Sequence, residues 1–181
     1  LLTRRNLLLG SASAAAGLAL YSGGIARHEI SILTHTIGID RLPDAFRNYR
    51  IAQISDIHFE EYTEPSFVRR VVGHVNSLAP DLVLLTGDYI SNSPLGANFA
   101  YHAIFRCADV LRGLDCPLRF AVMGNHDSIL GAPDVRQALA TASIPLLVNR
   151  HVAIERGGQR LWLAGVADPL TNVPNLQLAI P

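Results

Sequence analysis

Arg119-Phe-Ala-Val-Met-Gly-Asn-His-Asp127 is the stretch from which the fold of this chain is read. A short apolar run ends at Gly124 and is followed at once by Asn125, His126 and Asp127. A run of this length bounded by glycine predicts a buried β-strand rather than a helix. The predicted strand is therefore followed directly by side chains that can bind metal ions or carry protons.

Two earlier stretches have the same design. The run 50–55 is followed by Asp56 and His58, and the run 81–86 is followed by Asp88. The carboxyl ends of parallel strands lie at one edge of a sheet, where open α/β sheets bind their ligands. The three stretches therefore predict one site at the carboxyl edge of a mainly parallel sheet.

Helical patterns separate these strands. We expect helices over about 65–78, 97–114 and 133–142, each with one apolar face. The alternation of strands and helices predicts an α/β fold with helices packed on the sheet. Two later runs, 152–154 and 161–163, flank a Gly-Gly pair and predict a hairpin. Weak alternation over residues 29–39 predicts a lead-in strand.

The composition predicts a folded chain with a sizeable core. Hydrophobic residues make up 49% and charged residues 17% of the 181 residues, so disorder is not expected. All basic residues are Arg, and they balance the acidic residues to a net charge of zero. No basic excess points to nucleic acid, and the absence of Lys excludes a Walker A loop or a Schiff base. We expect Cys107 and Cys116 to be buried thiols, with a disulfide as the alternative in an exported protein.

Residues 1–26 are interpreted as a signal or anchor segment, set apart from the domain over residues 27–181. Thr3-Arg4-Arg5-Asn6-Leu7-Leu8 resembles the twin-arginine export signal, and no charge follows before Arg27. We expect the twin-arginine machinery as a partner and a location across or anchored to the bacterial cytoplasmic membrane, on its periplasmic or extracytoplasmic face. The alternative is an ordinary anchor helix, since about 20 apolar residues span a bilayer.

The polar residues after the strands suit a metal ion. Asp56 and His58 are two apart, so an extended chain points them to the same side. Asp88 and Asn125 add oxygen donors from neighbouring strands. Carboxylate, imidazole and amide together describe a site for Mn, Fe or Zn. Each residue alone is equally well explained as a capping or turn residue, but the whole set directly after strands indicates a metal site.

The chain resembles calcineurin-like metallophosphoesterases in three signature blocks: Ser55-Asp56-Ile57-His58, Thr86-Gly87-Asp88-Tyr89 and Gly124-Asn125-His126-Asp127. The resemblance covers about residues 49–168. With the twin-arginine leader, it points to the exported, membrane-associated phosphodiesterases similar to UDP-2,3-diacylglucosamine pyrophosphatases. It implies a β-sandwich flanked by helices (α/β/β/α), of which this chain holds the N-terminal portion with a mainly parallel sheet.

The resemblance also implies a binuclear centre of divalent ions, Mn, Fe or Zn. Asp56 and His58 would hold the first metal, Asp88 would bridge both, and Asn125 would hold the second. A metal-bridging hydroxide would attack the phosphorus of a phosphodiester or pyrophosphate. The implied substrate is a lipid- or nucleotide-linked phosphate ester, reached near the membrane surface.

Two further residues take catalytic roles by the same resemblance. His126 would bind the phosphate and protonate the leaving oxygen, and Asp127 would orient its imidazole. Nearby, Glu60, Glu61 and Glu64 are expected to form a solvated loop. Tyr89 is left open between substrate contact and half-buried packing.

The chain departs from the family pattern after Asp127. The family completes its site with a later His and a Gly-His-x-His block, whereas this chain has only His151 downstream. We expect His151 to be an exposed strand residue, the domain to be incomplete and this chain alone to be inactive. The alternative to a phosphoesterase is a truncated non-catalytic remnant or a membrane-tethered binding module.

Overall fold

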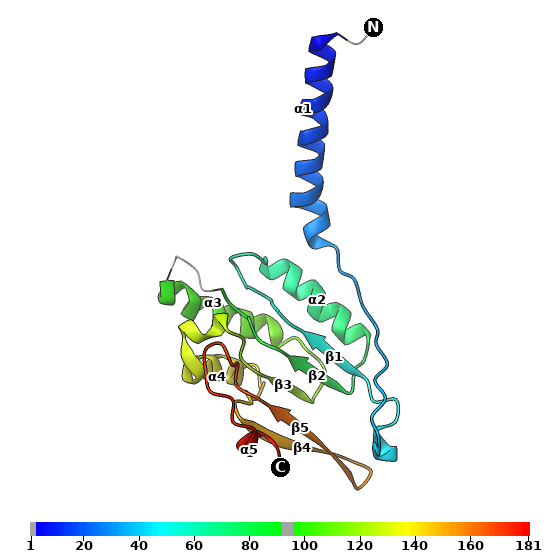
Figure 1. The fold of residues 1–181 in the computed structure, drawn as a ribbon, viewed down its shortest axis with the longest axis vertical. Helices are drawn as coiled ribbons and strands as arrows, with labels where there is room; N and C mark the ends of the chain where they lie inside the picture. The colour runs from blue at the N-terminus through cyan, green and yellow to red at the C-terminus, as the bar shows by residue number, and fades with distance from the viewer. Residues whose placement is uncertain (1–2, 92–95) are drawn as a thin grey trace. The chain divides into compact units, whose positions relative to one another are not determined.

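The computed structural model describes residues 3–91 and 96–181, which fall into two units, Leu1–Gly38 and Ile39–Pro181. In the first unit, α1 (Arg4–Leu20) continues into a π-helical turn (Tyr21–Ile25) and a 3-10 turn (Ala26–His28) (Figure 1). No side chain of α1 is buried. By length and composition, the helical stretch Arg4–Gly24 would suffice to cross a membrane, a test that signal sequences also pass.

The predicted strand over residues 29–39 is wrong. This segment forms no strand, and its apolar side chains Ile32, Leu33 and Ile37 are exposed. An alternating pattern produces a strand only when a neighbouring strand pairs with it. The described part of the chain supplies no such neighbour here.

A three-stranded parallel sheet forms the centre of the second unit (Figure 1). Its strands are β1 (Ile51–Ile54), β2 (Leu82–Leu85) and β3 (Arg119–Ala121), in that order. Ile54 pairs with Leu85, and Leu85 pairs with Ala121. The strands therefore end in register, which confirms the predicted parallel sheet and brings the loops after them to one edge.

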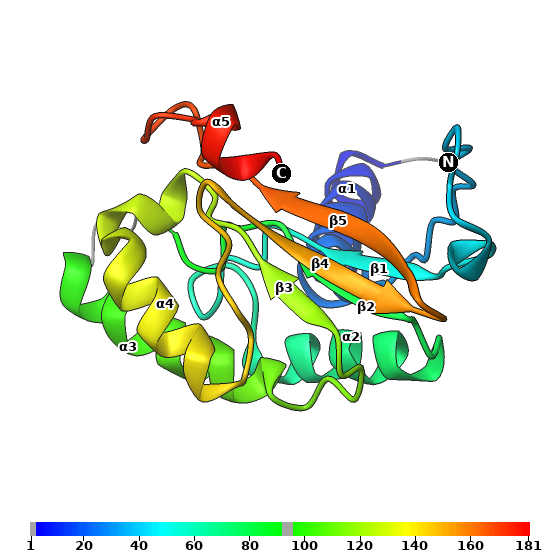
Figure 2. The same cartoon turned by 90° about the horizontal axis from the view of Figure 1, so that it is seen from below.

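Three helices cover one face of this sheet, as Figure 2 shows. They are α2 (Pro65–Ser77), α3 (Gly96–Leu111) and α4 (Gly131–Thr141), close to the predicted ranges. Their apolar faces and the sheet share one core, whose fully buried members include Val83, Ile104, Leu111, Val135 and Leu139. Each such side chain contributes about 1.5–3 kcal/mol on burial. This core holds the sheet edge that carries the site.

The hairpin of β4 (Arg150–Arg156) and β5 (Gln159–Gly165) lies over the other face of the sheet (Figure 2). Its turn residues Gly157 and Gly158 both have positive φ, as a type I′ turn requires. The inner face of the hairpin packs on the sheet in a second core cluster, which includes Phe46, Leu82, Leu84, Phe120 and Ile154. The predicted hairpin is confirmed, and the layers run helices, parallel sheet, hairpin.

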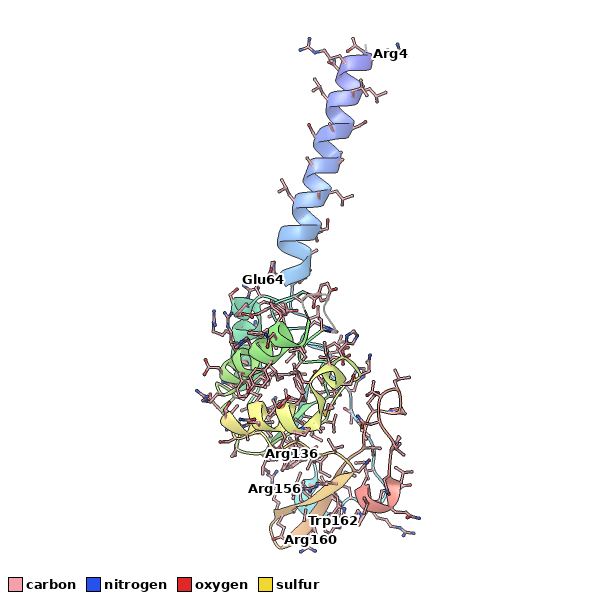
Figure 3. All side chains as sticks on the ribbon, turned by 90° about the vertical axis from the view of Figure 1, so that its left-hand side faces the viewer. Arg4, Glu64, Arg136, Arg156, Arg160 and Trp162 are labelled. Atoms are coloured by element: carbon pink, nitrogen blue, oxygen red, sulfur yellow. The ribbon has the colours of Figure 1, made fainter. Side chains whose placement is uncertain are left out.

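The outer face of the hairpin carries exposed side chains. Trp162 lies edge-on to His151, with ring centroids 5.2 Å apart, and Arg160 lies over the same Trp ring (Figure 3). His151 is exposed on β4, as predicted. A 3-10 turn (Asp44–Phe46) and the short helix α5 (Leu176–Ala179) complete the unit, apart from a turn at the site.

Both cysteines are free and buried, as predicted. Cys107 lies in the core on α3. Burial raises the pKa of its thiol well above the usual value, because the charged thiolate is poorly solvated there. The thiol therefore acts as a small apolar side chain.

Candidate metal centre

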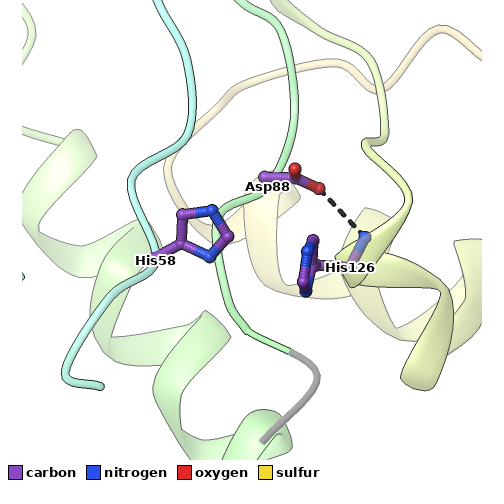
Figure 4. Close-up of side chains that lie close together, drawn as sticks. All are labelled: His58, Asp88 and His126. Carbon is purple, nitrogen blue, oxygen red and sulfur yellow. Dashed lines mark hydrogen bonds between the residues drawn. The ribbon is translucent and has the colours of Figure 1, made fainter. Parts of the chain in front are cut away.

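Each strand of the parallel sheet is followed by a loop that contributes one side chain to a compact polar group. His58 follows β1, Asp88 follows β2 and His126 follows β3. One nitrogen of each ring and one carboxylate oxygen of Asp88 all lie within 4.8 Å of one another. The two rings stand edge to face, 5.0 Å between centroids, and Figure 4 shows them converging with the carboxylate. Segments far apart in the sequence thus form one site.

The loops reach this geometry through left-handed backbone conformations. The φ angles are 54° at Asp56, 45° at His58 and 52° at Asp88. Such conformations cost on the order of 1–3 kcal/mol each and persist only where the surroundings enforce them. Here the amide of Asp56 donates to the carbonyl of Gly87 (3.1 Å), and the amide of His58 donates to the carbonyl of Asp88 (3.0 Å). The backbone ladder of β1 and β2 therefore continues into the loops and holds the strained residues.

Two glycines allow the second and third loops to approach each other. Gly87 has φ +96°, and a Cβ atom on it would collide with the backbone of Gly124. A Cβ atom on Gly124 would in turn collide with the carboxylate of Asp88. Only hydrogen fits at either position, so the placement of Asp88 depends on both glycines.

Asp127 is fully buried and joins the same two loops. Its Oδ2 accepts the amides of Asp88 and Gly124, both at 2.9 Å, and its Oδ1 accepts the amide of Tyr89 at 3.0 Å. Burial raises the pKa of Asp127 to about 6, and amide donors led by that of Gly124 oppose the increase. Both of its oxygens thus serve the backbone. The predicted role of Asp127 in orienting the ring of His126 stays a prediction.

Asp88 completes a reciprocal arrangement. Its Oδ1 accepts the backbone amide of His126 at 2.9 Å, the bond drawn in Figure 4. The amide of Asp88 donates to Asp127, and the carboxylate of Asp88 binds the loop that carries Asp127. The two loops are therefore cross-linked in both directions.

His58 has neighbours of its own. Ser91, in the loop after β2, is 6% exposed, and its Oγ lies 2.9 Å from Nδ1 of His58. The ring of Tyr62 lies edge-on to the His58 ring, 5.9 Å between centroids. With Nδ1 engaged by the hydroxyl, Nε2 is the nitrogen available to a metal ion.

The structure brings together only part of the predicted set. His58 and Asp88 lie in the compact group, and His126, predicted as a catalytic residue, joins them. Asp56 is exposed and lies outside this group in the described ranges. Asn125 is half-buried directly before the short 3-10 helix His126–Ile129. The individual roles of these residues stay predictions.

The donor set fits a divalent ion. The imidazole of His58 and the carboxylate of Asp88 supply the mixed nitrogen and oxygen donors that suit Zn, Mn or Fe, and the ring of His126 lies beside them. The backbone amide of His126 also donates to the carboxylate of Asp88, which favours a single orientation of that carboxylate.

The structure decides between the two expectations for Tyr89, substrate contact and packing. Tyr89 is fully buried, and its hydroxyl donates to the carbonyls of Leu85 (3.0 Å) and Val122 (2.8 Å), so Tyr89 packs in the core rather than contacting substrate.

The expectation that the glutamate loop is solvated is wrong. Glu60 has a side chain only 14% exposed and pairs with Arg106 at 2.7 Å, and Glu61 has a buried carboxylate oxygen.

The glutamate loop is held inward by its apolar anchor. Phe59 is 1% exposed and forms a β-bridge with Thr63, so the loop folds back on the core. Sequence reasoning also missed Ser91. It has no motif of its own, and only its place in the same loop as Asp88 could have drawn attention to it.

Comparison with known proteins places this site in a family. Residues 49–176 match the pattern described as calcineurin-like phosphoesterase. This match covers well over half of the chain and contains every residue of the compact group. The chain belongs to the calcineurin-like phosphoesterase family. The predicted family is thereby confirmed.

Curated relatives of this chain include three bacterial proteins. The metallophosphoesterase YkuE of Bacillus subtilis is 31% identical over 189 aligned positions, covering 99% of this chain and 62% of YkuE. The UDP-2,3-diacylglucosamine pyrophosphatase LpxG of Chlamydia muridarum is 35% identical over 48% of this chain and 26% of its own length. The phosphodiesterase YaeI of Escherichia coli is 28% identical over 66% of this chain and 44% of its own length. The chain thus spans about three-fifths of YkuE and less of the other two.

Proposed function

We propose that this phosphoesterase is a metal-dependent hydrolase of a phosphodiester or pyrophosphate bond in a lipid-linked or nucleotide-linked substrate. The observation that carries the proposal is the convergence of His58, Asp88 and His126 at the carboxyl edge of the sheet. Divalent ions bound there supply positive charge that stabilises the charge developing on the phosphoryl oxygens.

Metal binding and proton transfer belong to different side chains in the proposed reaction. His58 and Asp88 hold metal, with Asp56 and Asn125 as the further predicted ligands. The ring of His126 binds a phosphate oxygen and gives a proton to the leaving oxygen, a contribution of typically about 10²–10⁴-fold for such a group. The cross-linked loops keep Asp88 and His126 at a fixed separation, so little reorganisation is needed during the reaction.

The substrate class is supported by two relatives and by the N-terminal helix. LpxG is named for a pyrophosphatase activity on a UDP-linked diacylglucosamine, and YaeI is named a phosphodiesterase. α1 is apolar enough to be a signal or an anchor, which would place the site near lipid. We propose export by the twin-arginine route to the extracytoplasmic face of the membrane.

Hydrolysis of bis(p-nitrophenyl) phosphate by the full-length protein, with and without Mn²⁺, tests this function. We expect Mn²⁺-dependent turnover that EDTA abolishes and that Asp88→Asn reduces by at least about 10²-fold. Asp109→Asn is the matched control, because Asp109 is an exposed partner of Arg112 on α3. Metal binding without any turnover would favour the binding-module alternative, and metal-independent turnover would refute the proposed mechanism.

A further inference from the structure

Ser91 occupies a position that none of the three signature blocks includes. We propose that Ser91 is a positioning residue, which fixes the ring of His58 so that Nε2 faces the metal ion. The inference rests on the proposed function, because the ring direction matters only if His58 is a ligand. It adds a residue on which metal affinity depends without direct contact to the metal.

The geometry places the hydroxyl where such a residue has to be. Oγ of Ser91 lies 2.9 Å from Nδ1 of His58, and Ser91 is 6% exposed. Backbone hydrogen bonds join the loop that carries His58 to the loop that carries Ser91. The amide of His58 donates to the carbonyl of Asp88 (3.0 Å), and the amide of Phe59 donates to the carbonyl of Tyr89 (2.8 Å). The distance between Ser91 and His58 is therefore set by the fold rather than by a flexible side chain.

The chemistry of imidazole makes this contact directional. When Nε2 of a neutral ring binds a metal, Nδ1 carries the proton and needs an acceptor. Ser91 offers one, and the hydroxyl keeps its own proton for another acceptor. An outer partner at Nδ1 holds the ring of a metal-binding histidine in one direction, and the loss of such a partner typically costs about 10–100-fold in metal affinity.

Two aromatic rings also restrict the ring of His58. The rings of Tyr62 and His126 both meet it edge to face, which limits its tilt, while the hydroxyl of Ser91 meets Nδ1. The backbone of His58 is in the left-handed region, a conformation that persists only where the surroundings enforce it. Burial of a hydroxyl without a hydrogen-bond partner also costs free energy, so the contact with His58 stabilises the buried Ser91 in turn.

Metal affinity and the ring nitrogen of His58 that binds the metal together test the inference. Mn²⁺ and Zn²⁺ titrations by calorimetry on the metal-stripped protein would compare Ser91→Ala, Ser91→Thr and His58→Ala with the parent. We expect Ser91→Ala to weaken binding about 10–100-fold, Ser91→Thr to restore most of it and His58→Ala to remove the site. Long-range ¹⁵N NMR of the Zn²⁺-loaded protein should show His58 bound through Nε2 with Nδ1 protonated in the parent, and a mixture of Nε2 and Nδ1 coordination in Ser91→Ala.

A control and a second variant pair keep the test decisive. Ser77→Ala removes an exposed hydroxyl that caps α2 through the carbonyl of His74 (2.7 Å) and should leave the metal affinity unchanged. If Ser91→Ala does not fold, Ser91→Thr and Ser91→Val have nearly the same shape and differ in the hydroxyl alone. Equal affinity in that pair, or parent affinity in Ser91→Ala while His58→Ala loses binding, overturns the role of Ser91 and leaves the metal centre standing. Parent affinity in His58→Ala instead overturns the proposed centre itself.

Discussion

At the scale of single residues, Asp88 and Asp127 stabilise each other's loops. Asp127 accepts the amide of Asp88, and Asp88 accepts the amide of His126. A carboxylate that accepts backbone amides in a buried place is costly to replace, because each amide then loses its partner. The position of Asp88 thus depends on a neighbour with no exposed surface.

Asp127→Asn should lower both stability and metal affinity. The amide side chain presents a donor to backbone donors that the carboxylate accepted, so we expect a loss of about 1–3 kcal/mol in the free energy of unfolding. Urea unfolding measures it, with Asp109→Asn on the surface as the matched control. Unchanged unfolding and metal affinity in Asp127→Asn would show that the cross-link does not hold the site.

Gly87→Ala and Gly124→Ala should each disrupt the site for steric reasons. The added methyl group meets the opposite loop at both positions, so the loops separate or the protein is destabilised by at least about 1–3 kcal/mol. Gly73→Ala is the control, because Gly73 lies in α2 with nothing near its missing Cβ. There alanine should stabilise the helix by about 0.5–1 kcal/mol. Thermal unfolding of all three variants compares them, and equal effects at Gly73 and Gly87 would contradict the steric argument.

The residue types in the sequence pointed to the candidate site, but the backbone predicted for Asp56 and His58 differs from the backbone in the structure. The sequence placed Asp56 and His58 on one side because an extended chain alternates. Both residues instead have positive φ, so the chain turns, and Asp56 remains exposed while His58 enters the group. Histidine adopts the left-handed region more often than most residues, but contacts with the neighbouring loop are what enforce it at His58.

At the scale of elements, apolar periodicity located every core helix and strand. The predicted helix over 97–114 ends earlier, at Leu111, although Leu114 is buried. Burial of a side chain continues into the turn after a helix, so an apolar stripe overestimates helix length. A second overestimate occurred over residues 29–39, where alternation without a partner strand gave no strand.

Ile154→Ala should show that the hairpin is part of the fold rather than an appendage. Ile154 is 3% exposed and packs with Phe46 and Leu82 between the hairpin and the sheet. Truncation of such a side chain costs about 2–5 kcal/mol. Leu170→Ala is the control, because Leu170 is 79% exposed and should change stability by less than about 0.5 kcal/mol. A small effect of Ile154→Ala on chemical denaturation would mean that the hairpin unfolds independently.

At the scale of the whole molecule, the site exists only in the folded chain. His58, Asp88 and His126 come from loops after three different strands, so an unfolded chain cannot bring these side chains together. Export of an already folded protein would allow metal to be loaded before transport. The arginine pair at the start of α1 is the feature that makes this route testable.

Arg4→Lys together with Arg5→Lys separates the two interpretations of the N-terminal helix. Lysine keeps the positive charge that orients an ordinary anchor, so an anchor would insert as before. A route that reads the arginine pair itself would leave the variant in the cytoplasm, and this retention is the result we expect. Cell fractionation with protease accessibility measures it, and Arg69→Lys with Arg70→Lys on the exposed surface of α2 is the matched control. If the N-terminal variant reaches the extracytoplasmic face as efficiently as the control, the helix is a plain anchor, and metal loading has to follow transport because the chain then crosses the membrane unfolded.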